Sequence, residues 1–314
     1  MRTDGTGGRP AFVLNGARVR DTARLRRAFE QAAAAAGWQP PLMLPTTTDD
    51  GGTGQTRAAV DAGVALVVAV GGDGTVRACA AALASGRVPL AIVPAGSANL
   101  TARALGIPGR LRPALAVAFS GRDRPIDLGS ADGAVFVAMA GIGLDAAVVG
   151  AAQGLAKRLA GWPAYAAAAT GQLLRRPATF TIRIDDGEPL TRRARCVTVG
   201  NSGALPGGFP VMPDARLDDG RLDVVVLAPA SLPGWADVGL RIALGSRRDD
   251  AQLERYQATT VEITAEGPRL PRQLDGEIVE TSRSLSVRVL PAALLVRVPA
   301  AGAASQPPAG SRSG

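Results

Sequence analysis

The segment Ala65–Asn99 constrains the fold of this chain more than any other, because it holds two apolar runs that each end in a glycine-containing turn. Residues 65–70 form an unbroken apolar run, which is typical of a strand buried on both faces of a sheet. The turn Gly71–Gly74 follows it, and the apolar residues after the turn recur at helical spacing. Leu90–Val93 is a second such strand, with a turn over residues 94–99. The sequence therefore predicts repeated strand, turn and helix units in a largely parallel sheet.

The first of these turns has the composition of a phosphate-binding loop. Gly71, Gly72 and Gly74 allow positive φ angles and a close approach of the backbone to a ligand. The first amides of the following helix are unpaired and carry partial positive charge. Asp73 would repel a phosphate unless a divalent cation or a substrate hydroxyl lies between them, an arrangement that phosphoryl transfer uses. An ordinary glycine-rich turn is the alternative, and Asp73 favours the phosphate site.

Two motifs at this separation resemble the nucleotide-binding core of the diacylglycerol kinase catalytic family, which includes bacterial lipid kinases and sphingosine kinases. They are GGDGTV at residues 71–76 and PAGSANLTARALGIP at residues 94–108. NAD kinases and phosphofructokinases share the first motif, whereas the second is similar to the lipid-kinase version, which usually has threonine at the position of Ser97. The resemblance implies that ATP binds at Gly71, Gly72, Gly74, Thr75, Gly96, Ser97 and Asn99.

Two further residues of the first half are candidate nucleotide ligands by the same resemblance. Asn15 follows the predicted strand 11–14, at a position where the family contacts nucleotide phosphate, although the residues after it depart from the family pattern. Thr47 lies in a Thr-rich segment that resembles a nucleotide-contacting segment of the family. A helix-capping or turn role is an equal alternative for Thr47.

The pattern of elements changes near residue 127, where we place a domain boundary. Residues 10–127 read as a three-layer α/β nucleotide-binding domain with a mostly parallel sheet. Residues 128–298 contain many short strands separated by Gly, Asp and Pro turns, which predicts an antiparallel β-sandwich whose last segment could return to the first domain. Residues 155–174 are the exception, with helical periodicity. The tail 299–314 is rich in Ala, Gly, Pro and Ser, so we expect disorder there.

The resemblance extends across the second domain and covers residues 11–298. It implies that Asp127, in the sequence IDLG, helps to organise catalytic magnesium, and that Asp219 holds a structural divalent ion. Turn-forming carboxylates are the alternative at both positions. Glu277 is the implied general base, with Asp275 beside it, because a carboxylate is one of the few groups that can accept a proton in a chain without histidine. Asp73 is the rival base and a further candidate magnesium ligand. A β-turn with incidental acidic residues is the alternative for residues 275–277.

Composition narrows the function classes. No histidine is present, which excludes a Ser-His-Asp triad and an HExxH zinc site, and no GxxxxGK[ST] motif exists. The two cysteines lie far apart in the sequence, so we expect two buried free thiols in a reducing compartment. We expect neither a secretory signal nor a membrane-spanning segment. The net charge is +8, but the basic residues are not interleaved with aromatic residues as they are in RNA-binding proteins. The charge therefore favours an anionic membrane surface over nucleic acid as partner.

Together these features predict an ATP- and magnesium-dependent kinase that phosphorylates the hydroxyl of diacylglycerol or a related long-chain lipid. We expect it in the cytoplasm, associated peripherally with the membrane. Two alternatives stay open: a kinase for a soluble acceptor such as NAD, and a catalytically silent nucleotide- or lipid-binding protein. The sequence also leaves open which lipid is used and which oligomer forms, a homodimer included.

Overall fold

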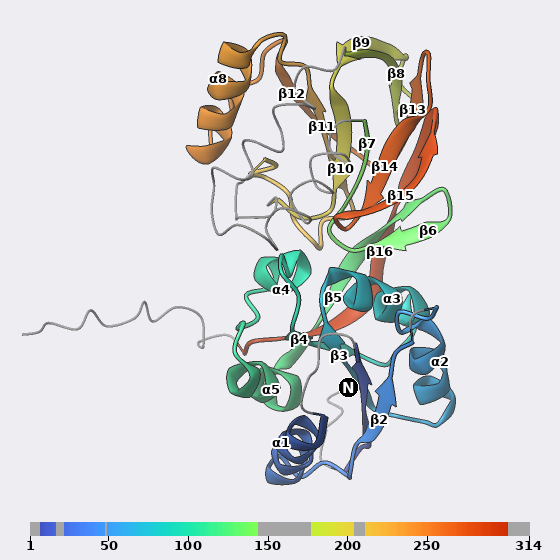
Figure 1. The fold of residues 1–314 in the computed structure, drawn as a ribbon, viewed down its shortest axis with the longest axis vertical. Coiled ribbons are helices and arrows are strands. Elements are labelled where there is room, and N and C mark those ends of the chain that lie inside the picture. The colour runs from blue at the N-terminus through green and yellow to red at the C-terminus, as the bar shows by residue number, and fades with distance from the viewer. Residues whose placement is uncertain (1–6, 17–21, 48, 144–176, 204–210, 301–314) are drawn as a thin grey trace, which may run out of the picture.

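The computed structural model of this chain describes residues 7–16, 22–47, 49–143, 177–203 and 211–300. These residues form two lobes, one above the other, joined by strands that run between them (Figure 1). The helix expected over residues 155–174 and residues 301–314 of the expected disordered tail lie outside the described residues.

The first lobe is built on a parallel sheet in the order β2-β1-β3-β4. Apolar runs form these strands, and every residue of β1 and β3 is buried, as expected for a sheet covered on both faces. Helices α1 and α5 contact each other, as do α2 and α3, and the two pairs lie on opposite sides of the sheet (Figure 1). The elements are β1 (Pro10–Leu14), α1 (Thr22–Ala35), β2 (Leu42–Pro45), α2 (Thr53–Asp61), β3 (Leu66–Gly71), α3 (Asp73–Leu83), β4 (Leu90–Pro94), α4 (Leu100–Ala104) and α5 (Leu111–Ser120).

The second lobe packs two antiparallel sheets face to face around a common core. Among the described residues, one sheet has the order β12-β11-β10-β7-β14-β15, and the other contains β13, β8 and β9. Phe180, Ile182, Val199 and Leu222 are fully buried between them. The elements are β6 (Ala134–Phe136), β7 (Met139–Gly143), β8 (Ala178–Ile184), β9 (Leu190–Ala194), β10 (Cys196–Gly200), β11 (Leu222–Leu227), α8 (Leu232–Ala243), β12 (Leu253–Ala258), β13 (Thr260–Ala265), β14 (Leu270–Leu274) and β15 (Glu277–Ser282).

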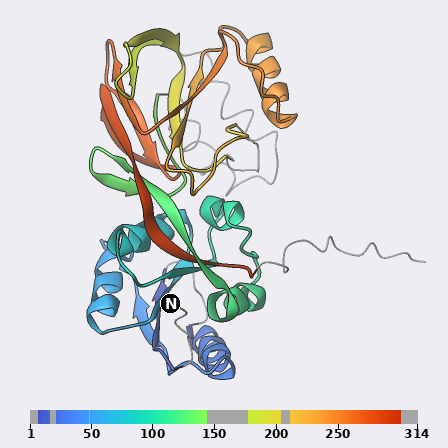
Figure 2. The ribbon, with the colours of Figure 1, turned by 180° about the vertical axis from the view of Figure 1, so that it is seen from behind.

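Two long strands connect the lobes, as the view from behind shows (Figure 2). They are β5 (Arg122–Ala131) and β16 (Ser284–Val298), which pair antiparallel along most of their length. In the second lobe β16 pairs with β13, and in the first it pairs parallel with β4 through Val296 and Leu90. The carboxyl end of the described chain therefore extends the sheet of the amino-terminal lobe.

The expected fold class, an α/β domain followed by an antiparallel β-sandwich, is confirmed. The unbroken apolar run over residues 135–140 predicts a single strand, but in the structure it divides into β6 and β7. At the break, the backbone amides of Val137, Ala138 and Met139 donate to the carboxylate of Asp275 and not to a neighbouring strand. This side chain comes from a segment more than 130 residues away, so local pattern could not reveal the break.

Candidate active site

The carboxyl ends of β1, β3 and β4 form the edge of the first lobe on which the predicted nucleotide ligands lie. The chain leaves β1 toward β2 on one side and returns to β3 on the other, which makes the β1/β3 junction a topological switch point where α/β sheets bind ligands. Asn15 follows β1, and its Nδ2 lies 3.3 Å from Oγ1 of Thr75 at the start of α3. Two predicted ligands that are 60 residues apart in sequence are thus brought together at this junction.

The two glycine-containing turns pack directly against each other. A Cβ atom built on Gly96 would lie 2.5 Å from the Cα of Gly72, a separation that real Cβ atoms do not adopt. A Cβ on Gly71 would lie equally close to the hydroxyl of Thr75. The absence of side chains at these positions therefore leaves a backbone-lined cradle beside the amino terminus of α3.

Asn99 fixes the second turn. Its Oδ1 accepts a hydrogen bond from the amide of Gly96, and its Nδ2 donates to the carbonyl of the same residue, both at 2.9 Å. Asn99 has a left-handed backbone with φ of 49°, a conformation that asparagine adopts more readily than most residues. Ser97 is exposed at the tip of this turn. The Asn99 side chain therefore fixes the turn by bonding both polar backbone groups of Gly96, and Ser97 is exposed.

Asp73, in the first motif, contacts the second motif through its side chain. Its Oδ1 accepts from the backbone amide of Thr101 in the first turn of α4 at 3.3 Å. Burial raises the pKa of the Asp73 carboxyl, and the amides of Thr101, Leu100 and Asn99 act in the opposite direction. The side chain therefore links the first glycine motif to α4, the helix within the second motif.

Asp275 belongs to the tight turn between β14 and β15. Asp275 and Gly276 both have positive φ, of 48° and 80°, as a two-residue hairpin turn requires. The Asp275 carboxylate is buried and accepts three hydrogen bonds, of 2.7 to 3.0 Å, from the amides between β6 and β7. Burial raises its pKa to about 6, while these amides and the charge of Arg77 act in the opposite direction. These contacts make Asp275 the anchor of the turn.

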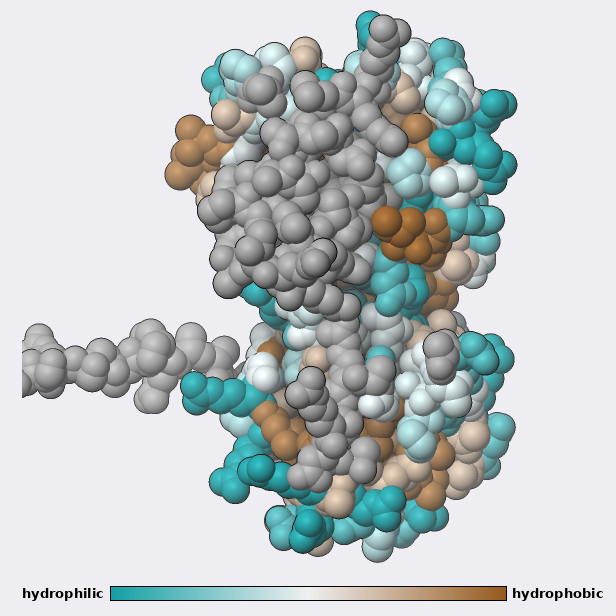
Figure 3. All heavy atoms as spheres, in the orientation of Figure 1, coloured by the Kyte–Doolittle hydropathy of each residue, from teal (hydrophilic) through white to brown (hydrophobic). Residues whose placement is uncertain are grey.

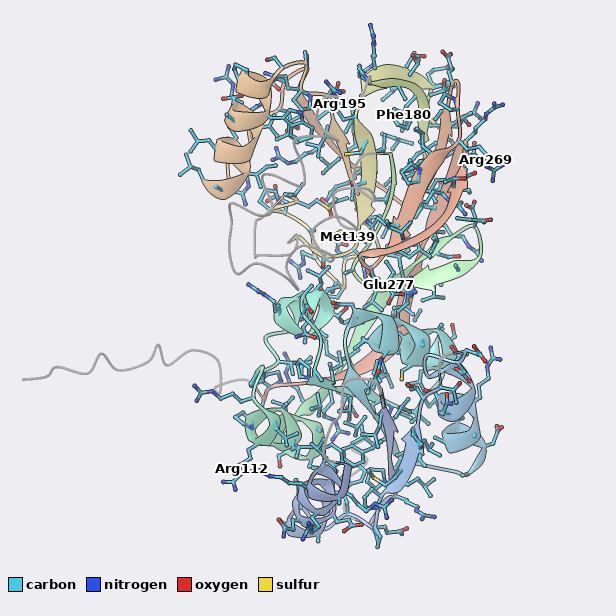
Figure 4. All side chains as sticks on the ribbon, viewed as in Figure 1. Arg112, Met139, Phe180, Arg195, Arg269 and Glu277 are labelled. Carbon is cyan, nitrogen blue, oxygen red and sulfur yellow. The ribbon has the colours of Figure 1, made fainter. Side chains whose placement is uncertain are left out.

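Glu277, at the first position of β15, faces the glycine motif of the other lobe. A Cβ atom built on Gly74 would collide with the Glu277 carboxylate, and Oε2 of Glu277 lies 2.5 Å from Nη2 of Arg77 in α3. Figure 4 shows Glu277 at the junction of the two lobes. Its side chain is 50% exposed, so the carboxylate is accessible at this junction. The tertiary structure thus places the candidate base beside the candidate phosphate site.

Asp127 occupies a different place in the interface between the lobes. Its Oδ2 accepts from the amide of Gly220 and its Oδ1 from the amide of Ala292, both at 2.7 Å. The side chain is buried, and Ala292 sits at the register shift of β16. The carboxylate therefore connects β5 to two distant segments through backbone amides.

The remaining predicted residues lie in turns. Oδ1 of Asp219 accepts from the amide of Arg221 within the same turn, and Oγ1 of Thr47 accepts from the amide of Asp50. In the described part of the chain, no three acidic or cysteine side chains gather closely enough to form a metal site. Any ion at Asp73, Asp127 or Asp219 would need oxygens from the backbone or a bound ligand as well.

Three residues that contact predicted site residues or their loops were not predicted from the sequence. Arg77 contacts the turn that carries Glu277. The buried side chain of Asn201 donates to the carbonyls of Asp127 and Val137. The carboxylate of Asp50 accepts from the amides of Gly52 and Gly54 at the start of α2. Of these, Asp50 had a sequence signal, since an acidic residue just before a helix is a common cap. Arg77 and Asn201 contact residues far away in sequence, which no local pattern reveals.

No helix among the described residues combines the length and the apolar character needed to cross a lipid bilayer. The space-filling view shows brown apolar surface only in separate patches over the described residues of this face, one of them over the outer part of α8 (Figure 3). Leu240 and Leu244, at the end of that helix, are exposed apolar residues.

The chain is similar to known proteins in sequence and in fold. The family model of the diacylglycerol kinase catalytic domain matches residues 12–131, and that of the YegS C-terminal NAD kinase beta sandwich-like domain matches residues 138–298. A "Probable lipid kinase YegS-like" of Pseudomonas aeruginosa is 37% identical over 257 residues, which cover 77% of this chain and 79% of that protein. The diacylglycerol kinase of Bacillus subtilis is 31% identical, with 68% and 71% covered. The fold is similar to a crystal structure of a diacylglycerol kinase from Bacillus anthracis, with a TM-score of 0.72, 22% identity, and 93% and 97% covered.

Proposed function

Because the chain belongs to the diacylglycerol kinase catalytic-domain family, with a second domain of the YegS type, we propose that it transfers the γ-phosphoryl group of ATP to a lipid hydroxyl. The acceptor is diacylglycerol or a related long-chain lipid, and the reaction depends on magnesium. The observation that carries the proposal is the position of the Glu277 carboxylate against Gly74, where an acidic side chain of one lobe meets the glycine motif of the other.

The ATP phosphates bind in the cradle between the two glycine turns. Its backbone lining at Gly72 and Gly96 lets a phosphate approach without meeting a side chain. The amino terminus of α3 points its unpaired amides and the positive end of its dipole at the same place. Asn15 and Thr75 supply polar groups on the β1 side, and Thr47 and Ser97 remain candidate nucleotide ligands.

Glu277 accepts the proton of the lipid hydroxyl as its oxygen attacks the γ-phosphorus. The half-exposed carboxylate has room to meet an acceptor, and Asp275 holds the turn that presents it. Phosphoryl transfer needs alignment and charge neutralisation more than covalent help from the protein. A fixed carboxylate beside the phosphate cradle supplies the alignment.

Asp73 is the residue we assign to magnesium at the cradle, because a carboxylate oxygen is the kind of ligand that this ion prefers. When bound, magnesium would neutralise the negative charge of the phosphates. Asp127 and Asp219 are further candidates. Asp127 already accepts two backbone amides, so its contribution would come through lone pairs that those bonds leave unused.

We place the reaction at an anionic membrane surface on the cytoplasmic side. The net charge of +8 supports this location, since basic proteins are attracted to acidic lipids. A lipid acceptor is further supported by the relatives named as lipid and diacylglycerol kinases.

The test is transfer of labelled γ-phosphate from ATP and magnesium to micellar diacylglycerol, sphingoid base, ceramide and monoacylglycerol, with NAD as soluble acceptor. We expect label in a lipid product, and its loss with Glu277→Gln. Label on NAD alone would replace the lipid acceptor by a soluble one. ATP binding without transfer to any acceptor in the panel would contradict the proposed activity and favour a silent binding protein.

A further inference from the structure

We propose that Arg77 is a positioning residue, which holds the Glu277 carboxylate in place against the glycine motif and so aligns the two lobes for transfer. The inference rests on the proposed function, and it assigns a task to a side chain that neither glycine motif predicted. Arg77 itself touches neither nucleotide nor acceptor in this proposal; it acts through Glu277.

The guanidinium of Arg77 contacts the β14–β15 turn at two points. Nη1 donates to the carbonyl of Leu274 at 3.0 Å, just before the turn, and Nη2 donates to Oε2 of Glu277 at 2.5 Å, just after it. Arg77 lies in α3 four residues after Asp73, and therefore on the same side of that helix. One side chain of the nucleotide-binding lobe thus holds both ends of the turn that carries the candidate base.

The turn is anchored independently on its other side by the Asp275 carboxylate and the amides between β6 and β7. That anchor fixes the backbone of the turn to the segment after β6, and β6 packs against α3. The Arg77 contacts add a direct link from α3 to the turn and to the Glu277 side chain. Together with Gly74, against which Oε1 of Glu277 lies, they determine the direction in which the carboxylate points.

Arginine suits this task because its planar guanidinium can donate to a carbonyl and to a carboxylate at the same time. Lysine would keep the charge but could not reproduce both directed bonds at once. The Arg77 side chain is 20% exposed and that of Glu277 is 50% exposed, and ion pairs that solvent reaches in this way add little to stability. The pair is therefore better suited to fixing geometry than to holding the fold together, and its loss should appear in turnover more than in melting temperature.

The chain offers a matched control in Arg192, whose Nε lies 2.8 Å from Oε1 of Glu254. This pair joins β9 to β12 within the second lobe and has a similar partial exposure, 36% and 19%. Arg192→Met removes one arginine–glutamate pair without touching the junction of the lobes. This variant measures how much the loss of an arginine–glutamate pair away from the junction changes kcat and thermal stability.

The experiment measures kcat, KM for ATP and thermal stability for wild type, Arg77→Met, Arg77→Lys, Arg192→Met, Glu277→Gln and the double variant Arg77→Met/Glu277→Gln. We expect Arg77→Met to lower kcat about 10- to 100-fold, the range for a misplaced catalytic group, with KM for ATP within about twofold of wild type, since a positioning role leaves ATP binding intact. Arg77→Lys should recover part of the loss, and Arg192→Met should match wild type. In the Glu277→Gln background, Arg77→Met should lower kcat no further, because residues that act through one another are non-additive.

Two results would overturn the assignment while leaving the lipid kinase intact. One is a wild-type kcat in a folded Arg77→Met protein. The other is an equal loss with and without Glu277, which would show that Arg77 acts by itself. If Arg77→Met is too unstable to assay, Arg77→Lys and Arg77→Gln replace it. Their kcat values are then compared with and without Glu277→Gln in the same way. A wild-type protein that transfers phosphate to no acceptor would overturn the proposed function and this role together, so the two failures are distinct.

Discussion

Gly72 and Gly96 approach each other so closely that a Cβ atom built on Gly96 would lie 2.5 Å from the Cα of Gly72. They belong to different motifs, one after β3 and one after β4. Their contact converts two separate turns into a single backbone-lined cradle, and this requirement explains why neither position carries a side chain.

Gly96→Ala should therefore disrupt this cradle. The added methyl group must displace the backbone of Gly72, and overpacking of this kind costs about 1 to 3 kcal/mol. We expect at least a tenfold weaker affinity for ATP, measured by calorimetry, with a lower free energy of unfolding. Gly109→Ala is the control, because a Cβ there meets nothing within 4 Å. Equal ATP affinity in both variants would show that the cradle does not hold the nucleotide.

Glu277→Gln and Asp73→Asn should separate the two candidate bases. A general base contributes typically about 100- to 10,000-fold to the rate, so Glu277→Gln should lower kcat by such a factor and leave KM for ATP nearly unchanged. Asp73→Asn should instead weaken the binding of magnesium and ATP, and part of its loss should be recovered at high magnesium concentration. If Asp73→Asn lowers only kcat while Glu277→Gln is as active as wild type, the assignment of the two residues is reversed.

Asp127→Ala should destabilise the protein whether or not this residue binds magnesium. It removes the carboxylate that accepts the part-buried hydrogen bonds from the amides of Gly220 and Ala292, and a hydrogen bond to a charged group contributes about 1.5 to 3 kcal/mol. We expect the free energy of unfolding in urea to fall by about 2 to 4 kcal/mol. Asp61→Ala, at an exposed position at the end of α2, should change it by less than about 0.5 kcal/mol. Similar stability of both variants would show that the hydrogen bonds of the Asp127 carboxylate do not stabilise the fold.

Asp223 should make stability depend on pH in a mildly acidic window. Burial, together with the negative charges of Asp219 and Asp214, raises its pKa from 3.8 to about 6, while the hydrogen bond from Gln257 acts in the opposite direction. Between these two values the native state holds a proton that the unfolded chain has lost, so this residue's contribution to stability falls as pH rises from about 4 to about 6. Above pH 6 the buried charge is a net cost.

Asp223→Asn removes that ionisation. Relative to wild type, it should gain about 2 kcal/mol more stability at pH 8 than at pH 4. The measurement is urea unfolding at both pH values, in the presence of a chelator so that no divalent ion binds near Asp219. A difference between wild type and variant that is the same at both pH values would contradict the raised pKa.

The sequence by itself determined the local units of this protein. Apolar runs followed by glycine-containing turns specify β3 and β4, because burial on two faces favours apolar residues and the close packing of Gly72 against Gly96 excludes side chains. The same local logic predicted the short strands of an antiparallel β-sandwich, and the second lobe confirms this fold class. The family resemblance then supplied Glu277 and Asp275 as candidates, without their geometry.

The tertiary structure decided which of these residues meet. It placed Glu277 against Gly74, about two hundred positions earlier in the chain, and brought Arg77 to the turn between them. It also divided residues 135–140 into two strands around the Asp275 carboxylate, and carried β16 back to β4. None of these contacts has a local signature, because a long-range hydrogen bond or ion pair depends on how two lobes pack and not on the residues next to it in sequence.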